Sequence, residues 1–129
     1  DTWLMNKYIG GGVRSFRINC PHRLNLHSDE RKLCNTHPHN YYLEILADLG
    51  MVGFGLISLI FLLTVYQTFI KKYIFITSLN SNLIITPFIF LFLIEIFPIR
   101  STGSFFTTAN STYIFLILAI LIALSKKHN

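Results

Sequence analysis

The segment His37-Pro38-His39-Asn40 holds the side chains of this chain that are best suited to proton transfer. Proline at the first helical position is preorganised for φ and gives up no hydrogen bond there, so we expect a helix to begin at Pro38. His39 would then lie in the first turn, where the positive end of the helix dipole disfavours imidazolium. The pattern predicts a neutral imidazole that can act as a general base.

The same helix would continue into Gly50-Met51-Val52-Gly53, which nine intervening residues separate from Asn40. At 100° per residue a narrow stripe on one face holds His39, Leu43, Leu46, Gly50 and Gly53. Asp48 points to the opposite face. Glu44 and Asp48 both lie away from this stripe, just before the apolar run, and we expect both carboxylates to stay in water. The simpler alternative is that Asn40 caps the helix and His39 rests at the interface. His37 could orient an acceptor, bind phosphate or merely flank the proline.

A glycine-rich turn, Gly10-Gly11-Gly12, precedes Arg14 and Arg17. Glycines allow close backbone approach, and guanidinium groups match phosphate oxygens bidentately. A diphosphate ligand would suit this segment. The alternative is a loop whose arginines are solvated near anionic headgroups.

Cys20 and Cys34 are the only cysteines of the chain. In an oxidising compartment such a pair predicts a disulfide. The competing interpretation is a zinc site, whose ligands would come from Cys20, His22, His27, Cys34, His37 and His39. It lacks the paired Cys-x-x-Cys spacing, so we expect the disulfide and no metal or other cofactor.

Composition indicates a protein that uses lipid as its solvent, because 52% of the 129 residues are apolar and only 13% are charged. We expect an all-α membrane protein of about three transmembrane helices, preceded by an extracytoplasmic loop and forming part of a larger polytopic bundle. Residues 49–70 carry no charge and are long enough to cross a ~30 Å hydrocarbon core. The other expected spans are 83–99 and 106–125.

Charge sets the expected orientation. Lys71-Lys72 and Lys126-Lys127 would be cytoplasmic by the positive-inside rule, which places residues 1–48 and the 98–112 loop on the outer face. The net charge of +5 also includes basic residues of the outer segment. No nucleic-acid signature is visible. No cleavable signal peptide is visible either, so we expect a fragment.

Small and charged residues near the helices have a structural interpretation. Gly50 and Gly53 would let helices pack closely, and Gly50 would also allow a bend between an interfacial helix and the span. Glu95 near the end of the second span would pair with Arg100, as an interfacial ion pair or as part of an active-site floor.

These motifs together resemble a known superfamily. His39-Asn40, nine residues, then Gly50-x-x-Gly53 is similar to the signature of the O-antigen ligase and polymerase superfamily. The run from Gly11 to Arg17 resembles the glycine-phenylalanine element that opens its large outer loop. Phe54 departs from the glycine, threonine or tyrosine usual in the family. The resemblance covers residues 10–70 by motif and implies the carboxyl-terminal part of a larger protein.

The resemblance implies metal-independent transfer of a glycan from undecaprenyl diphosphate to an acceptor, such as lipid A-core or another sugar, at the periplasmic face of the bacterial inner membrane. His39 would be the catalytic base. Substrate-binding residues would be Arg14, Arg17, His37, Asn40 and Arg100. Ligase, polymerase and protein O-glycosylating ligase remain open. A transporter and a noncatalytic scaffold are the alternatives from other classes.

Overall fold

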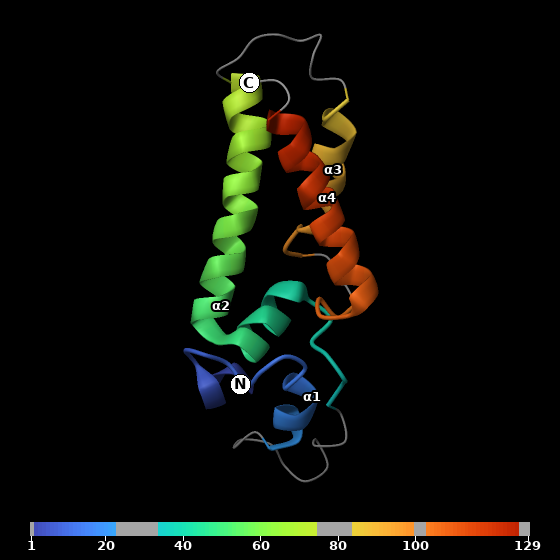
Figure 1. Cartoon of the computed structure of the whole chain (residues 1–129). Helices are drawn as coiled ribbons and strands as arrows, with labels where there is room; N and C mark the ends of the chain where they lie inside the picture. The colour runs from blue at the N-terminus through green and yellow to red at the C-terminus, as the bar shows by residue number, and fades with distance from the viewer. Residues whose placement is uncertain (1, 23–33, 75–83, 100–102, 127–129) are drawn as a thin grey trace. The chain divides into compact units, whose positions relative to one another are not determined.

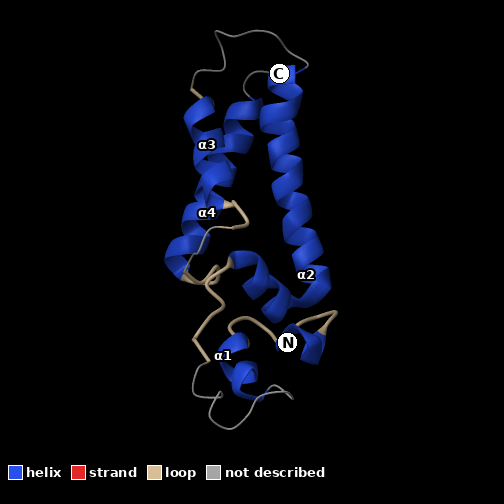
Figure 2. Ribbon diagram, turned by 180° about the vertical axis from the view of Figure 1, so that it is seen from behind, coloured by secondary structure: helices blue, strands red, loops and turns tan. Residues whose placement is uncertain are grey.

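The computed structural model of the chain describes residues 2–22, 34–74, 84–99 and 103–126, with the backbone alone for 72–74. All regular elements in these ranges are helical, as Figure 2 shows by colour, which confirms the all-α prediction for the described part. In chain order (Figure 1) they are η1 (Thr2–Asn6), α1 (Phe16–Asn19), η2 (Cys20–His22), α2 (Tyr41–Val65), η4 (Tyr66–Ile74), α3 (Thr86–Glu95) and α4 (Thr108–Lys126).

Two of the described helices are long and apolar enough to cross a bilayer. The first is the run Tyr41–Lys71, in which α2 continues into the π-helix η4, and the second is α4. In the described part of the predicted span 83–99, residues 84–99, the helix is the ten-residue α3. Ten residues rise about 15 Å, roughly half of a hydrocarbon core, so α3 does not form the full span that we expected. Pro98 disfavours helical φ and ψ in the residue before it, in keeping with this early end.

Helix α2 bends sharply at Gly50, whose φ of 65° and ψ of −168° are not helical. Residues with a Cβ atom essentially never adopt these angles, so the bend requires glycine. It divides α2 into a first segment, 41–49, and a second segment, 51–65. The predicted bend at Gly50 is confirmed.

The chain forms two compact units. Unit 1 comprises the residues up to Ile57 together with Pro98–Asn110. The first segment of α2 supplies much of its core, since Tyr41, Ile45 and Ala47 are buried. The Tyr41 ring packs edge-on against Phe105, with 5.5 Å between the ring centroids. Unit 1 contains nearly all the residues to which the sequence assigned chemistry.

Unit 2 comprises Ser58–Phe97 and the residues from Ser111 onward. Figures 1 and 2 both show α3 and α4 side by side in it. Phe61 of α2 meets Phe92 of α3 at a centroid distance of 5.5 Å. The buried residues recur at helical spacing and include Ile85, Ile89, Phe92, Ile114, Ile117, Leu118 and Leu121. The outer faces also carry large apolar side chains, such as Phe90 and Leu116, which favours a lipid environment.

Candidate functional site

The glycine-rich turn lies against the bend of α2 and binds its free backbone groups. A broken helix leaves carbonyl groups without partners before the break and N–H groups without partners after it. Gly11 and Gly12 donate their N–H groups to the carbonyls of Ala47 and Asp48, at 3.3 and 2.8 Å. Met51 and Val52, after the break, donate to the carbonyls of Lys7 and Tyr8, at 2.9 and 3.1 Å. The bend is therefore completed by a segment from much earlier in the chain.

Two glycines make this close approach of backbones feasible. A Cβ atom on Gly10 would overlap the Asp48 carbonyl oxygen, and one on Gly50 would overlap the Tyr8 carbonyl oxygen. Real Cβ atoms do not approach other atoms that closely. The structure thus gives the turn a role in completing the bend.

Asp48 is completely buried, which corrects the expectation that it stays in water. Its Oδ2 accepts the N–H of Arg14 at 2.6 Å, and its Oδ1 accepts the Ser15 hydroxyl and the Phe16 N–H, both at 3.0 Å. A buried carboxylate needs such donors to offset its desolvation. Arg14 has a positive φ of 62°, so this carboxylate also holds a backbone conformation that side-chain-bearing residues rarely adopt.

Glu44, one helical turn before Asp48, is also buried. The expectation that its carboxylate stays in water is therefore wrong as well. Its two carboxylate oxygens accept the hydroxyl of Ser104 and the N–H of Phe105, each at 2.5 Å. Residues four apart share a helix face, so both carboxylates project from one side of the first segment of α2. Glu44 fixes the 103–107 loop and Asp48 fixes the 14–16 loop.

A cavity of about 170 Å³ lies within unit 1, between these two loops and the chain that precedes α2. Its lining includes two of the three predicted substrate-binding arginines and one of the two predicted histidines. It is formed by Arg14, Arg17, Thr36, His37, Glu44, Ser104 and Thr107. The two guanidinium groups give the lining more positive than negative charge, because Glu44 is its only carboxylate. Both oxygens of Glu44 already accept hydrogen bonds. The cavity is smaller than a typical organic-ligand pocket and is suited to one compact anionic group.

The arginines reach the cavity from different positions on one short stretch. Arg14 is also held at its guanidinium, where Nη2 donates to the carbonyl of Phe106 at 3.4 Å. Arg17 lies in α1 and is exposed. Arg14 thus belongs to one loop that borders the cavity and is bonded to the other, whereas Arg17 lines the cavity from α1.

His37 and His39 lie next to each other but differ in their surroundings. Their ring centroids are 4.6 Å apart. His37 lines the cavity, and its Nδ1 lies 3.1 Å from the Thr36 hydroxyl. His39 does not line the cavity; its ring is exposed, and its Nε2 lies 3.3 Å from the Asn35 side-chain amide. The structure therefore places His37 closer to the candidate site than His39, the predicted base.

The prediction that the helix begins at Pro38 is wrong, because α2 begins at Tyr41. Asn40 is the cap: its Oδ1 accepts the N–H groups of Tyr42 and Leu43, at 3.0 and 3.2 Å. Its Nδ2 donates to the carbonyl of Pro98 at 2.7 Å. The simpler interpretation of Asn40 is confirmed. His39 precedes the helix, so neither the dipole argument nor the stripe shared with Gly50 applies to it.

The predicted disulfide is present between Cys20 and Cys34. It deprives the zinc interpretation of its thiolate ligands. Because Cys34 is only three residues before His37, the bond attaches the histidine-bearing stretch to η2. Cys20 is buried in unit 1, so this attachment is part of the core.

The predictions for Gly53 and Arg100 remain to be compared with the structure. A Cβ atom on Gly53 would overlap the Leu49 Cβ, so this glycine accommodates the bend within α2. The packing of separate helices against Gly53 stays a prediction. Arg100 lies outside the described residues, and so does its predicted ion pair with Glu95, which is buried at the end of α3.

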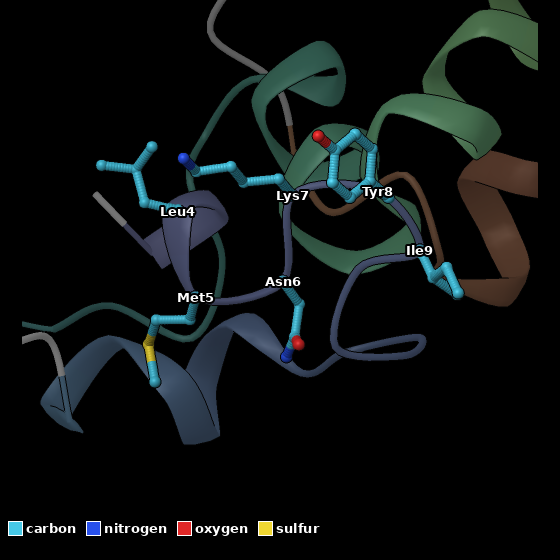
Figure 3. A pocket seen from close by; sticks show the side chains of 6 residues that line it. All are labelled: Leu4, Met5, Asn6, Lys7, Tyr8 and Ile9. Carbon is cyan, nitrogen blue, oxygen red and sulfur yellow. The ribbon is translucent and has the colours of Figure 1, made fainter.

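A second hollow in unit 1, of about 360 Å³, is formed by the consecutive residues Leu4, Met5, Asn6, Lys7, Tyr8 and Ile9 (Figure 3). It has a single basic group, Lys7, and no carboxylate. Four of its six side chains are large and apolar. This composition does not resemble a catalytic site.

No family model, curated protein or solved structure matches the chain. The motif resemblance to the O-antigen ligase and polymerase superfamily therefore stays a prediction.

Sequence reasoning missed Glu44, Ser104, Thr36 and Thr107 as residues of the cavity. One signal was present: Glu44 and Asp48 are four residues apart on the same face of a helix. A pair of carboxylates on one face just before an apolar run requires donors from elsewhere in the chain. The Ser104 and Thr107 hydroxyls carry no such signal, because serine and threonine are frequent in loops.

Proposed function

We propose that this protein is a membrane glycosyltransferase that moves a glycan from an undecaprenyl-diphosphate carrier to an acceptor sugar at the periplasmic face of a bacterial inner membrane. The observation that carries the proposal is the meeting of Arg14, Arg17 and His37 in one cavity. They come from two separate stretches of the sequence, residues 14–17 and the stretch that carries His37.

The cavity supports the diphosphate part of this proposal. Arg14 and Arg17 supply positively charged N–H donors at the lining of the cavity. Such donors stabilise the negative charge that develops on a departing diphosphate. A volume of about 170 Å³ suits phosphate groups, so the sugar chain would extend outside the cavity.

The histidines support the proton transfer. The acceptor hydroxyl oxygen forms a bond to the anomeric carbon, while the bond from that carbon to the diphosphate oxygen breaks. The electron pair leaves with the diphosphate, and the hydroxyl proton passes to an imidazole nitrogen. His39 is the predicted proton acceptor, and His37 is placed at the cavity itself. A single displacement of this kind inverts the anomeric centre.

The membrane part of the proposal is supported by composition and helix length. The run Tyr41–Lys71 and helix α4 are each able to span a bilayer. The cavity residues Glu44, Arg14 and Arg17 belong to the same compact unit as the start of the first of these runs. In this proposal the diphosphate of a lipid-linked donor, which lies outside the hydrocarbon region, would bind near the start of the run Tyr41–Lys71, where these residues are.

The test is glycan transfer in a bacterial strain that lacks its own O-antigen ligase. The complete protein is expressed as wild type and as Arg17→Ala, His37→Ala and His39→Ala, and lipopolysaccharide is compared by gel ladder. His22→Ala is the matched control, because His22 is exposed and does not line the cavity. Loss of one transition-state contact should lower transfer about 100-fold or more.

The pattern of variants decides between the residues. Loss of transfer in Arg17→Ala and in one histidine variant, with His22→Ala unaffected, supports the proposal and identifies the base. An altered chain-length distribution instead of lost capping identifies a polymerase. Full transfer by all three cavity and histidine variants would contradict the proposed function.

A further inference from the structure

The stretch Leu4–Ile9 of unit 1 exposes large apolar side chains. Tyr8 is 74% exposed and Ile9 is 82% exposed, and Leu4 and Met5 are about half-exposed. Four exposed apolar side chains thus lie within one short stretch, which we call the anchor segment (Leu4–Ile9). Neighbouring exposed apolar residues of this kind mark a surface that a membrane or a second molecule covers.

Backbone hydrogen bonds fix the level of the anchor segment relative to α2. The carbonyls of Lys7 and Tyr8 accept the N–H groups of Met51 and Val52, at 2.9 and 3.1 Å. Met51 and Val52 form the first turn after the bend, and their own side chains are more than half exposed. The apolar surface of the anchor segment therefore continues into the apolar surface at the start of the second segment of α2.

The polar groups of the anchor segment match a membrane interface. Figure 3 shows Leu4, Lys7 and Tyr8 directed to one side of the segment, and Met5 and Asn6 directed toward α1 on the other. A lysine and a tyrosine next to aliphatic residues are typical of the headgroup level, where the ammonium stays wet and the ring lies at the boundary. Anionic headgroups would also attract Lys7.

We infer that the anchor segment lies in the headgroup region of the bilayer, with Tyr8 and Ile9 at the boundary of the acyl chains. The occupant of this surface is lipid, because the segment is bonded to the first turn of a run that is itself suited to lipid. The inference rests on the membrane location in the proposed function and is independent of glycan transfer.

The experiment measures the depth of a tryptophan in nanodiscs of phosphatidylcholine and phosphatidylglycerol. Trp3 is the only tryptophan of the chain, so Trp3→Phe gives a silent background. Tyr8→Trp reports on the anchor segment, and Ile18→Trp is the control. Ile18 is 61% exposed and lies in α1, which is bonded to Asp48 before the bend. Each variant is quenched by lipids brominated in their acyl chains and, separately, by iodide.

We expect brominated lipid to quench the Tyr8→Trp variant at least twofold more than the Ile18→Trp variant, and iodide to quench in the opposite order. Lipid quenching of Tyr8→Trp that is no greater than that of Ile18→Trp, in a chain that co-purifies with nanodiscs, would overturn the inference alone. It would leave the proposed glycosyltransferase intact, because the chain would still be in the membrane. A chain that does not co-purify with nanodiscs would overturn the inference and the membrane location together.

Discussion

Glu44 and Asp48 show how two carboxylates can be structural residues at the edge of an apolar helix. Each is buried, and each directs both of its oxygens to donors on a loop that is distant in sequence. The loops would otherwise have unpaired backbone N–H groups inside unit 1. These residues therefore position the walls of the cavity, and the cations of the cavity are supplied by a loop and a helix that Asp48 holds.

Asp48→Asn should destabilise unit 1 by about 2–3 kcal/mol, because the new amide group faces N–H and O–H donors and leaves one of them unpaired. Ser15→Ala, which removes one neutral donor and leaves the carboxylate, should cost about 1 kcal/mol. The measurement is the midpoint of thermal unfolding in detergent, followed by the fluorescence of Trp3 in the same unit. Equal midpoints for Asp48→Asn and wild type would show that the carboxylate is not needed.

Gly50→Ala should be among the most damaging single-methyl substitutions in α2. The angles at Gly50 are essentially reserved for glycine and cost other residues about 1–3 kcal/mol, and the added Cβ would also meet the Tyr8 carbonyl. Gly55→Ala is the matched control, because Gly55 is helical and has nothing near the added methyl group. It should be neutral or stabilise by up to about 1 kcal/mol. Circular dichroism during heating would rank the two variants, and the reverse order would refute the bend.

At the scale of elements, the disulfide connects the stretch before α2 to the end of α1 through η2. It limits the positions that Thr36 and His37 can occupy in the unfolded and folded chain. Residues 34–40 of this stretch have no regular secondary structure of their own. Its position depends on Cys34 at one end and on the Asn40 cap at the other.

Replacing both cysteines by serine should lower stability by about 3 kcal/mol, the entropy of closing a loop of this length. It should also weaken the binding of inorganic pyrophosphate to the cavity, measured by isothermal titration calorimetry, because the stretch that carries Thr36 and His37 is released. Wild type in a reducing agent should behave in the same way. Unchanged pyrophosphate affinity in the double variant would show that the disulfide does not support the cavity.

The packing of α3 gives a second element-scale prediction. Phe92 is buried against Phe61, whereas Phe90, two residues earlier, is 57% exposed. Phe92→Ala should cost about 3 kcal/mol through the cavity that it leaves, and Phe90→Ala should cost little. Thermal unfolding of the two variants in the same detergent provides the comparison. A larger loss for Phe90→Ala would reverse the assigned faces of α3.

The sequence predicted the elements that depend on local pattern. The uncharged run after Leu49, the special conformation of Gly50 and the pairing of two isolated cysteines were all readable from residue type and order. The start of α2 was misjudged by three residues because Pro38 and Asn40 are both start signals and only the side chain of Asn40 makes the capping bonds.

The composition of the cavity could not be predicted, because the cavity depends on contacts between segments that are distant in the sequence. A helical wheel shows that Glu44 and Asp48 point away from the glycine stripe, but it does not show which loops cover that face. The loops that do so lie 34 residues before Asp48 and 60 residues after Glu44. For the same reason His37 and Thr107 could not be assigned to one cavity from their positions in the chain.

At the scale of the whole molecule, the two units differ in the kinds of side chain that they contain. Most buried and most exposed large side chains in the described part of unit 2 are apolar, with Thr64, Thr68 and Glu95 as buried exceptions, whereas unit 1 contains the cavity and its cations. This division agrees with a protein that has one part in lipid and one part at an aqueous face. In the proposed function that face is periplasmic, as the positive-inside rule predicts.

The orientation can be tested by labelling single cysteines in intact cells. With Cys20 and Cys34 replaced by serine, Asn35→Cys should react with a membrane-impermeant maleimide, because Asn35 is exposed in unit 1. Lys126→Cys, at the end of α4, should react only after the cells are lysed. Labelling of Lys126→Cys in intact cells, with Asn35→Cys protected, would invert the topology and exclude a periplasmic site.

The bend at Gly50 also has a consequence for biosynthesis. The backbone partners of Ala47, Asp48, Met51 and Val52 all come from residues 7–12, which leave the ribosome before the helix does. When the bent helix emerges, the stretch of chain that completes it has already been translated on the same nascent polypeptide. A permuted gene that encodes residues 7–12 after α4 would present a broken helix to the insertion machinery with its polar backbone unsatisfied, and its yield of inserted protein should fall.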